Sequence, residues 1–211
     1  TMSSYVGELL KLIIAGATQL GKQNKTSDAL KLCDQVINFA LSSRLRISHQ
    51  TLLIVHALKC LILNEVKAHA DALAEVEIAE KYASSLSEDD RKRIHGLLVN
   101  MFADKALLHV SLRQYDAAIR TLKGAMREYG CEDVLVGCMA TSYYYLDDFK
   151  RADKYLAQYL EQTTKAQSAD KRISGEIVSK ALEKAGAWPH IISMFCEADR
   201  TEELAEGILT W

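Results

Sequence analysis

The feature that most constrains this chain is an internal repeat, because the sequence overlays on itself at a shift of 34 residues. Small and large apolar residues both match in the overlay. Ala106, Tyr115, Ala118, Leu122 and Ala125 align with Ala140, Phe149, Ala152, Leu156 and Tyr159. A period of this length is typical of proteins that stack helix pairs, in which each pair buries its apolar face only against its neighbours.

Composition and turn signals indicate that nearly the whole chain is helical. One proline and 10 glycines in 211 residues leave little turn chemistry for a sheet. Ser87, with Asp90 three residues later, predicts a capped helix start, and Gly130 predicts a helix end at a left-handed residue. We expect about eleven helices, separated by breaks at 22–26, 43–47, near 67, at 87, 113–115, 130, 147–148, 163–168, 186–189 and 199–201.

The segment 102–164 resembles the tetratricopeptide repeat (TPR) family. In its first unit Phe102 stands at the usual first-helix aromatic, Ala106 at the small crossing position and Tyr115 at the start of the second helix. In its second unit, Val136, Ala140 and Phe149 take these three positions. The other packing positions of this unit are Tyr143, Ala152, Leu156 and Tyr159.

Weaker copies can be placed over the N-terminal half. One contains Ala17, Leu20, Ala29, Cys33 and Val36, and the other contains Cys60, Leu63, Ala72, Val76 and Ala79. Ala29 and Ala72 are 43 residues apart, and Ala72 and Ala118 are 46 apart, so these pairs need longer helices or loops. Lys59 and Lys105 also depart from the family, which usually has leucine there.

The resemblance implies an all-α fold, a right-handed superhelical stack of antiparallel helix pairs that forms a single α-solenoid domain over 1–211. The repeats match best at 102–164, and we expect capping helices at 168–211, where Trp188 and Pro189 precede an apolar run. An ordinary helical bundle is the alternative, but recurring small residues at one point of each helix favour close helix crossing.

If the family geometry holds, the first helix of each pair lines a concave groove that binds a helical or extended segment of a partner protein. The expected groove residues are Ala103, Leu107, Val110, Ser111, Gly137, Thr141, Tyr144 and Tyr145. Tyrosines contribute contact area and a hydroxyl group at low entropic cost. We therefore expect a noncatalytic scaffold or adaptor subunit within a larger complex.

Other function classes are weakly indicated. A net charge of −2 disfavours dedicated binding of nucleic acid or of anionic membranes, and no apolar run is long enough to cross a bilayer.

Five cysteines without Cys-x-x-Cys spacing suggest buried thiols in a reducing compartment, cytoplasmic or nuclear. The sequence contains no His-Glu-x-x-His, phosphate loop or nucleophile elbow. We expect no enzyme activity, catalytic residue, cofactor or metal, although His49 and His56 could share a helix face.

Three further alternatives remain at this stage. Apolar segments at 191–195 and 204–211 could pair between chains to give a homo-oligomer. Nucleic-acid binding would use a basic spot formed by Arg44, Arg46, Arg91, Lys92 and Arg93. A branch of the TPR family grips the C-terminal carboxylate of chaperones with asparagines and lysines, but the positions after the crossing residues are Thr18, Leu61, Leu107 and Thr141, which disfavours this type.

Overall fold

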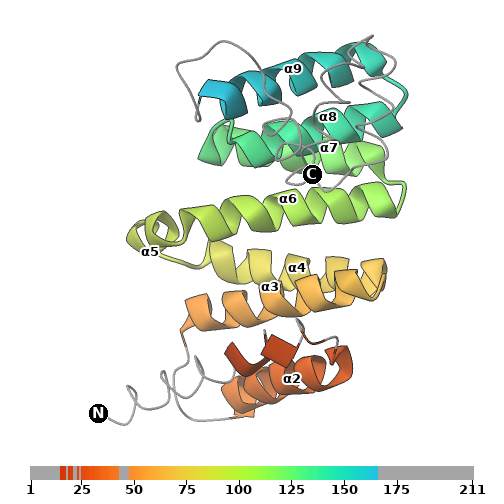
Figure 1. Ribbon diagram of the computed structural model, residues 1–211. Coiled ribbons are helices and arrows are strands. Elements are labelled where there is room, and N and C mark those ends of the chain that lie inside the picture. The colour runs from red at the N-terminus through yellow and green to blue at the C-terminus, as the bar shows by residue number, and fades with distance from the viewer. Residues whose placement is uncertain (1–14, 18, 21–22, 24, 43–47, 166–211) are drawn as a thin grey trace. The chain divides into compact units, whose positions relative to one another are not determined.

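The computed structural model describes residues 15–17, 19–20, 23, 25–42 and 48–165 (Figure 1). Within these residues the secondary structure is helical and contains no strand. The helices are α2 (Thr26–Ser42), α3 (His49–Glu65), α4 (His69–Ser84), α5 (Glu88–Arg93), α6 (His95–Ser111), α7 (Tyr115–Tyr129), α8 (Asp133–Tyr145) and α9 (Phe149–Lys165).

The helix number corrects the sequence prediction. The described residues contain about nine helices, counting α2 to α9 and the helical residues near position 17, rather than about eleven. The breaks predicted near 67, at 87, 113–115, 130 and 147–148 fall in or beside the gaps between these helices, and the one at 22–26 ends at the start of α2. The break predicted at 43–47 lies outside the described residues. Those expected at 186–189 and 199–201, together with the capping helices at 168–211, lie outside the described residues.

One break was missed, at Ile94, where the sequence predicts a continuous helix after Ser87. Ile94 separates α5 from α6 with a φ of −110° and a ψ of 22°. Its amide still donates to the Asp90 carbonyl at 3.2 Å, and its carbonyl accepts from the Leu98 amide at 3.0 Å. The hydrogen bonds therefore run through the bend, and no glycine or proline is needed there to signal it.

The chain divides into two compact units, Thr1–Met101 and Phe102–Trp211, with the boundary inside α6. In the first unit α3 packs against both α2 and α4; in the second, α8 packs against both α7 and α9. The best-matched repeats, at 102–164, belong to the second unit. A single continuous domain over 1–211 stays a prediction.

Small residues occupy the helix crossings in both units. The expected first-helix positions, Ala17, Cys60, Ala106 and Ala140, are at most 2% exposed. The second-helix positions Ala29, Ala72, Ala118 and Ala152 are at most 1% exposed. Small side chains allow two helix backbones to approach closely. These sites therefore permit tight helix pairing in the best-matched repeats at 102–164 and in the weaker N-terminal copies. The weaker N-terminal copies are thus confirmed as structural repeats.

The turns inside the helix pairs repeat one backbone geometry. Lys67, Arg113 and Asp147 lie in the left-handed region, with φ of 61°, 58° and 58°. They are 46 and 34 residues apart, as are the buried alanines that follow them. After each, the next amide donates to the carbonyl five residues earlier, which closes the preceding helix. These bonds join Ala68 to Leu63 at 3.0 Å, Gln114 to His109 at 2.7 Å and Asp148 to Tyr143 at 3.0 Å, and an equivalent bond joins Lys25 to Leu20 at 2.9 Å.

The longer spacings have a structural cause, as the sequence predicts. α3 and α6 have 17 residues each, whereas α8 has 13. The short helix α5 also lies between α4 and α6, and Ser87 caps it by accepting from the Asp90 amide at 3.2 Å. Gly130 ends α7 with a φ of 89°, which confirms the predicted positive-φ residue.

Enlarging a crossing alanine should destabilise the fold. Ala152→Leu places a larger side chain where the methyl group is 1% exposed, so the free energy of unfolding should fall by about 1–3 kcal/mol. Ala157→Leu, at an exposed site of the same helix, should change it by less than about 0.5 kcal/mol. Urea titration followed by circular dichroism checks both variants, and equal effects would contradict the crossing role of Ala152.

Relieving a left-handed turn should stabilise the fold. Lys67→Gly removes a side chain from a residue with a φ of 61°, where a non-glycine residue costs about 1–2 kcal/mol. Glycine also gains freedom in the unfolded chain, so the expected net gain is about 0.5–1 kcal/mol. Lys67→Ala is the control, because alanine keeps the backbone penalty. Equal denaturation midpoints for Lys67→Ala and Lys67→Gly would refute the explanation that relief of the left-handed backbone stabilises the fold.

Candidate interaction surface

On α6, two of the four expected groove residues are accessible. Ala103 and Val110 are buried, Leu107 is partly exposed, and Ser111, the last residue of the helix, is exposed. Leu107 and Ser111 are one turn apart and therefore share a helix face. The accessible part of the expected surface on α6 is thus its C-terminal end.

On α8 the accessible residues again lie at the C-terminal end. The helix is buried continuously from Leu135 to Tyr143, so Gly137 and Thr141 are covered. A Cβ atom on Gly137 would lie 3.4 Å from the Tyr159 ring of α9, and the Thr141 hydroxyl donates to the Gly137 carbonyl at 3.2 Å. Tyr144 and Tyr145 are partly exposed.

These two tyrosines belong to a row of four rings, which we call the aromatic row: Tyr115, Tyr145, Tyr144 and Phe149. Tyr115 stacks on Tyr145 with ring centroids 5.6 Å apart and an interplanar angle of 11°. Tyr145 meets Tyr144 edge-on at 6.2 Å, and Tyr144 meets Phe149 edge-on at 5.5 Å. The pKa of Tyr145 is raised, mainly by burial and to a smaller extent by the nearby Tyr115 and Tyr144. The row joins the starts of α7 and α9 to the end of α8.

The sequence indicates each ring of the row but not their contact. Tyr115 and Phe149 open their helices at equivalent repeat positions and are expected to pack, whereas Tyr144 and Tyr145 are expected to face a groove. The structure brings all four together. Phe149 remains 46% exposed and the neighbouring Leu146 remains 38% exposed, so apolar surface persists beside the row.

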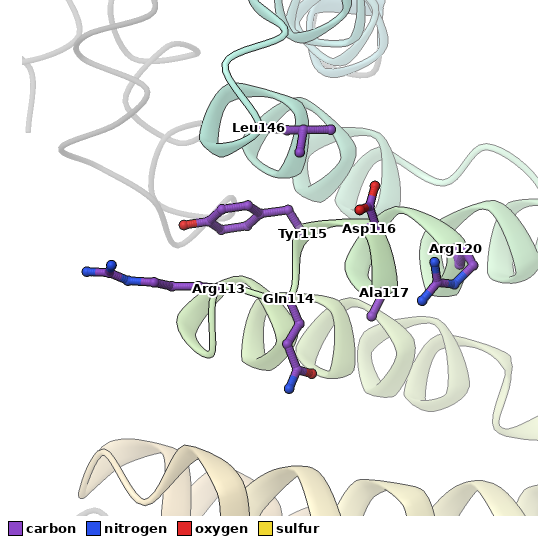
Figure 2. Close-up of a pocket in the computed structure, with 7 residues that line it drawn as sticks. All are labelled: Arg113, Gln114, Tyr115, Asp116, Ala117, Arg120 and Leu146. Carbon is purple, nitrogen blue, oxygen red and sulfur yellow. The ribbon is translucent and has the colours of Figure 1, made fainter.

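A pocket of about 370 Å³ lies at the turn between α6 and α7, beside Tyr115 (Figure 2). Its lining residues are Arg113, Gln114, Tyr115, Asp116, Ala117, Arg120 and Leu146. The sequence prediction did not include this pocket, because its residues come from a turn, a helix start and the end of α8.

The electrostatics of the pocket depend on Arg113 and Arg120. Both are exposed, and neither side chain makes an ion pair or hydrogen bond within the described residues. The Gln114 side chain contacts His109 Nδ1 at 2.8 Å and does not cap α7, so the positive end of that helix also faces this region. Asp116, in the first turn of α7, partly offsets the positive charge.

Arg151, by contrast, is engaged. Its Nε lies 3.1 Å from an Asp148 carboxylate oxygen, and its guanidinium group lies 5.3 Å from the centroid of the Tyr143 ring. Tyr143 in turn stacks on Tyr155 at 5.6 Å. This arginine stabilises the α8–α9 pair and leaves little capacity for a ligand.

In the first unit, an ionic cluster links three helices. Glu75 of α4 accepts from Lys59 Nζ at 2.7 Å and contacts His56 Nδ1 at 2.6 Å, and Lys59 also pairs with Asp34 of α2 at 2.8 Å. Burial by itself would raise the pKa of Glu75, but the hydrogen bonds from His56 and Lys59 outweigh it and the pKa is lowered. Lys59, where the TPR family usually has leucine, was the sequence signal for this cluster. The cluster holds the helices together.

The cysteines behave as packing residues with one exception. Cys33, Cys60 and Cys138 are buried and not in disulfides, whereas Cys131 is exposed; Cys196 lies outside the described residues. The pKa of Cys33 is raised to about 11, mainly by burial and to a smaller extent by the nearby Asp34. Burial raises the pKa of Cys138 to about 12. Both thiols are protonated at neutral pH and are therefore poor nucleophiles.

His49 and His56 do share a helix face, as the sequence suggests, but both contact Tyr82. The His56 ring stacks on Tyr82 at 5.7 Å, and the His49 ring lies 5.6 Å from it. His49 Nδ1 also lies 2.6 Å from the Ser85 hydroxyl oxygen. In the part of the chain that the structure describes, no group of three His, Cys, Asp or Glu side chains is arranged to hold a metal ion.

The basic residues of α5 are engaged locally. Lys92 pairs with Glu88 at 3.0 Å and Arg93 with Asp90 at 3.9 Å. Arg91 Nε donates to the Ala83 carbonyl at 3.3 Å. Arg44 and Arg46, the other members of the expected basic spot, lie outside the described residues, as do the apolar segments at 191–195 and 204–211.

None of the described helices combines the length and apolar character needed to span a membrane.

Solved structures share this fold. A structure from Podosopora anserina, described as kinesin light chain nearly identical TPR-like repeats, matches with a TM-score of 0.61 and 14% identity over 90% of this chain and 97% of that chain. A single-substitution variant of it matches equally well and is covered over 96% of its length. The MamA MSR-1 C2 structure matches with a TM-score of 0.54 and 12% identity, over 93% of this chain and 98% of that one.

These likenesses show the fold, and the chain is a TPR-like helical repeat protein in that sense. No protein-family model matches the chain, and no curated protein matches its sequence.

The ionic cluster yields a pH-dependent prediction. Glu75→Gln should lower the free energy of unfolding at pH 7 by about 1–3 kcal/mol, because Lys59 and His56 lose a charged acceptor while largely buried. The folded-state pKa of Glu75 lies below its ordinary value of 4.5, so its contribution is complete above that pH. It is lost as the pH falls through the folded-state value.

The difference between wild type and Glu75→Gln should therefore shrink on acidification below pH 4.5, as measured by urea titration at several pH values. Glu77→Gln, at an exposed site of the same helix, is the matched control and should have little effect at any pH. A Glu75→Gln deficit that stays constant down to acid pH would contradict the charged cluster.

Proposed function

We propose that this chain is a noncatalytic scaffold or adaptor that binds a helical or extended segment of a partner protein within a larger complex. The observation that carries the proposal is the accessible surface in the second unit, where Leu107 and Ser111 end α6 and Tyr144 and Tyr145 end α8. Tyrosine and aliphatic side chains at such positions are typical of protein interfaces.

The environments of three groups capable of acid–base or nucleophilic chemistry support binding rather than catalysis. The Cys33 and Cys138 thiols are protonated and buried, and the carboxylate of Glu75 is bonded to Lys59 and His56. A nucleophile or general base needs an activated group within reach of a substrate, whereas these groups serve packing and helix pairing. The TPR-like fold of the solved relatives supports the same class of function.

The finer features belong to the same proposal. A right-handed superhelical arrangement of the helix pairs would place the first helices, and therefore Leu107 and Tyr144, along one binding groove. The buried free thiols fit a reducing compartment, cytoplasmic or nuclear.

Replacing Leu107 and Tyr144 with aspartate should abolish partner capture. Each change places a charge on apolar contact surface, and the loss of interface residues of this kind weakens binding by about thirtyfold or more. The measurement is affinity purification from the source cells, with mass spectrometry of the recovered proteins.

A matched control introduces two aspartates elsewhere in the same unit, at the exposed Lys123 and Lys154. Circular dichroism melts of both double variants establish that each is folded. Capture that survives Leu107→Asp with Tyr144→Asp in a folded chain would reject this surface.

A further inference from the structure

We propose that the pocket at the α6–α7 turn binds carboxylate side chains of an acidic segment in the partner protein, with Arg113 and Arg120 as the binding residues. The inference rests on the proposed function and names the chemistry of the partner. It depends on two arginines without acidic partners, a pocket between them and apolar surface at its rim.

Arg113 and Arg120 differ from several other basic residues of the chain in lacking an acidic partner. Arg151 pairs with Asp148, and Lys92 and Arg93 pair with acids of their own helix, so those charges are already balanced. Arg113 and Arg120 make no such contact within the described residues, although both line one pocket. A guanidinium group presents five donors in a planar fork that matches a carboxylate, so the two side chains are available for charge-assisted hydrogen bonds.

The two arginines come from different elements, Arg113 from the α6–α7 turn and Arg120 from α7. Arg113 occupies the left-handed turn position with a φ of 58°, where Lys67 and Asp147 stand in the other helix pairs. Figure 2 shows the Arg113 and Arg120 guanidinium groups at opposite ends of the pocket. They are therefore suited to two carboxylates spaced along one segment, and not to a single carboxylate held by both.

The charge balance favours an acidic protein segment over nucleic acid. Asp116 lies in the same pocket, so the lining carries two positive charges and one negative charge. Nucleic-acid sites usually neutralise several phosphates, which needs more positive charge than this lining carries.

The aromatic row supports the same choice. Tyr115 and Tyr145 stack on each other at 5.6 Å and 11°, so these rings are used within the row and are poorly placed to stack on bases. The exposed Leu146 at the rim offers contact to an aliphatic side chain. The expected segment therefore carries separated Asp or Glu residues together with an aliphatic residue.

The test uses the full chain and a display library of random linear peptides. Peptides selected on the wild-type chain should be enriched in separated acidic residues. A selected peptide, measured by fluorescence anisotropy, should bind about tenfold more weakly to Arg113→Gln or to Arg120→Gln, because each loses a charge-assisted contact. Affinity should also fall as salt is added.

Two further variants sharpen the result. Lys123→Gln with Lys154→Gln removes two positive charges at exposed sites outside the pocket lining and should leave affinity within about twofold. Arg113→Lys with Arg120→Lys keeps the charges but removes the planar forks, so its affinity should lie between those of wild type and the glutamine variants. Both arginines are exposed, so none of these changes removes a core contact.

The outcomes separate this inference from the proposed function. Peptides that lack acidic residues, or that bind the glutamine variants as well as wild type, overturn the inference and leave the scaffold proposal standing. A library that yields no binder on the folded wild-type chain counts against the scaffold proposal and overturns the inference with it. Binding of single-stranded oligouridine that is lost in the same variants would assign the arginines to nucleic acid and overturn the acidic-segment assignment.

Discussion

Close approach of paired helices at small side chains is the constraint on which the rest of the structure depends. Ala118 and Ala152 are nearly inaccessible at equivalent points of α7 and α9, and Ala72 occupies the same point of α4. A larger residue would push the helices apart and open the core on both sides of the crossing. Since three of the pairs are closed by the same left-handed turn, the position of each of these crossings along its helix is set by backbone hydrogen bonds as well as by packing. The two constraints act on neighbouring residues and reinforce each other.

Function depends on what these constraints leave free. The middle of α8 is buried on all sides, so a partner can reach only the ends of this helix, and the C-terminal end carries Tyr144 and Tyr145. The accessible side chains of the proposed surface therefore lie at the ends of helices and in the turns that follow them. In the first unit, charged residues serve the opposite purpose: Lys59 and Glu75 are drawn inward to link three helices. The same residue types thus stabilise one part of the chain and are available for recognition in another.

The repeat could be predicted from sequence because it depends on residue size at fixed intervals, which is visible in one dimension. Ala106, Ala118, Ala140 and Ala152 indicated the helix pairs, and the divergent copies around Ala29 and Ala72 followed despite their irregular spacing. The bend at Ile94 was not predicted, because its hydrogen bonds continue and Ile94 itself is not a helix-breaking residue. The pocket was also missed, since Arg113 stands in a turn, Arg120 belongs to α7 and Leu146 comes from the end of α8. Burial of Gly137 and Thr141 depends on what covers α8 and is not encoded in the spacing of that helix.

The left-handed turn residue has a consequence for how such chains diversify. Its backbone conformation is the same in three helix pairs, yet the side chain is a lysine at 67, an arginine at 113 and an aspartate at 147. All three are exposed, and the conformation favours glycine over each of them and aspartate over the two basic residues. The backbone conformation at this position is therefore fixed, whereas the side chain can vary. Substitution there can invert the local charge of a repeat protein at little energetic cost, so new specificities can evolve without any change to the packed interior.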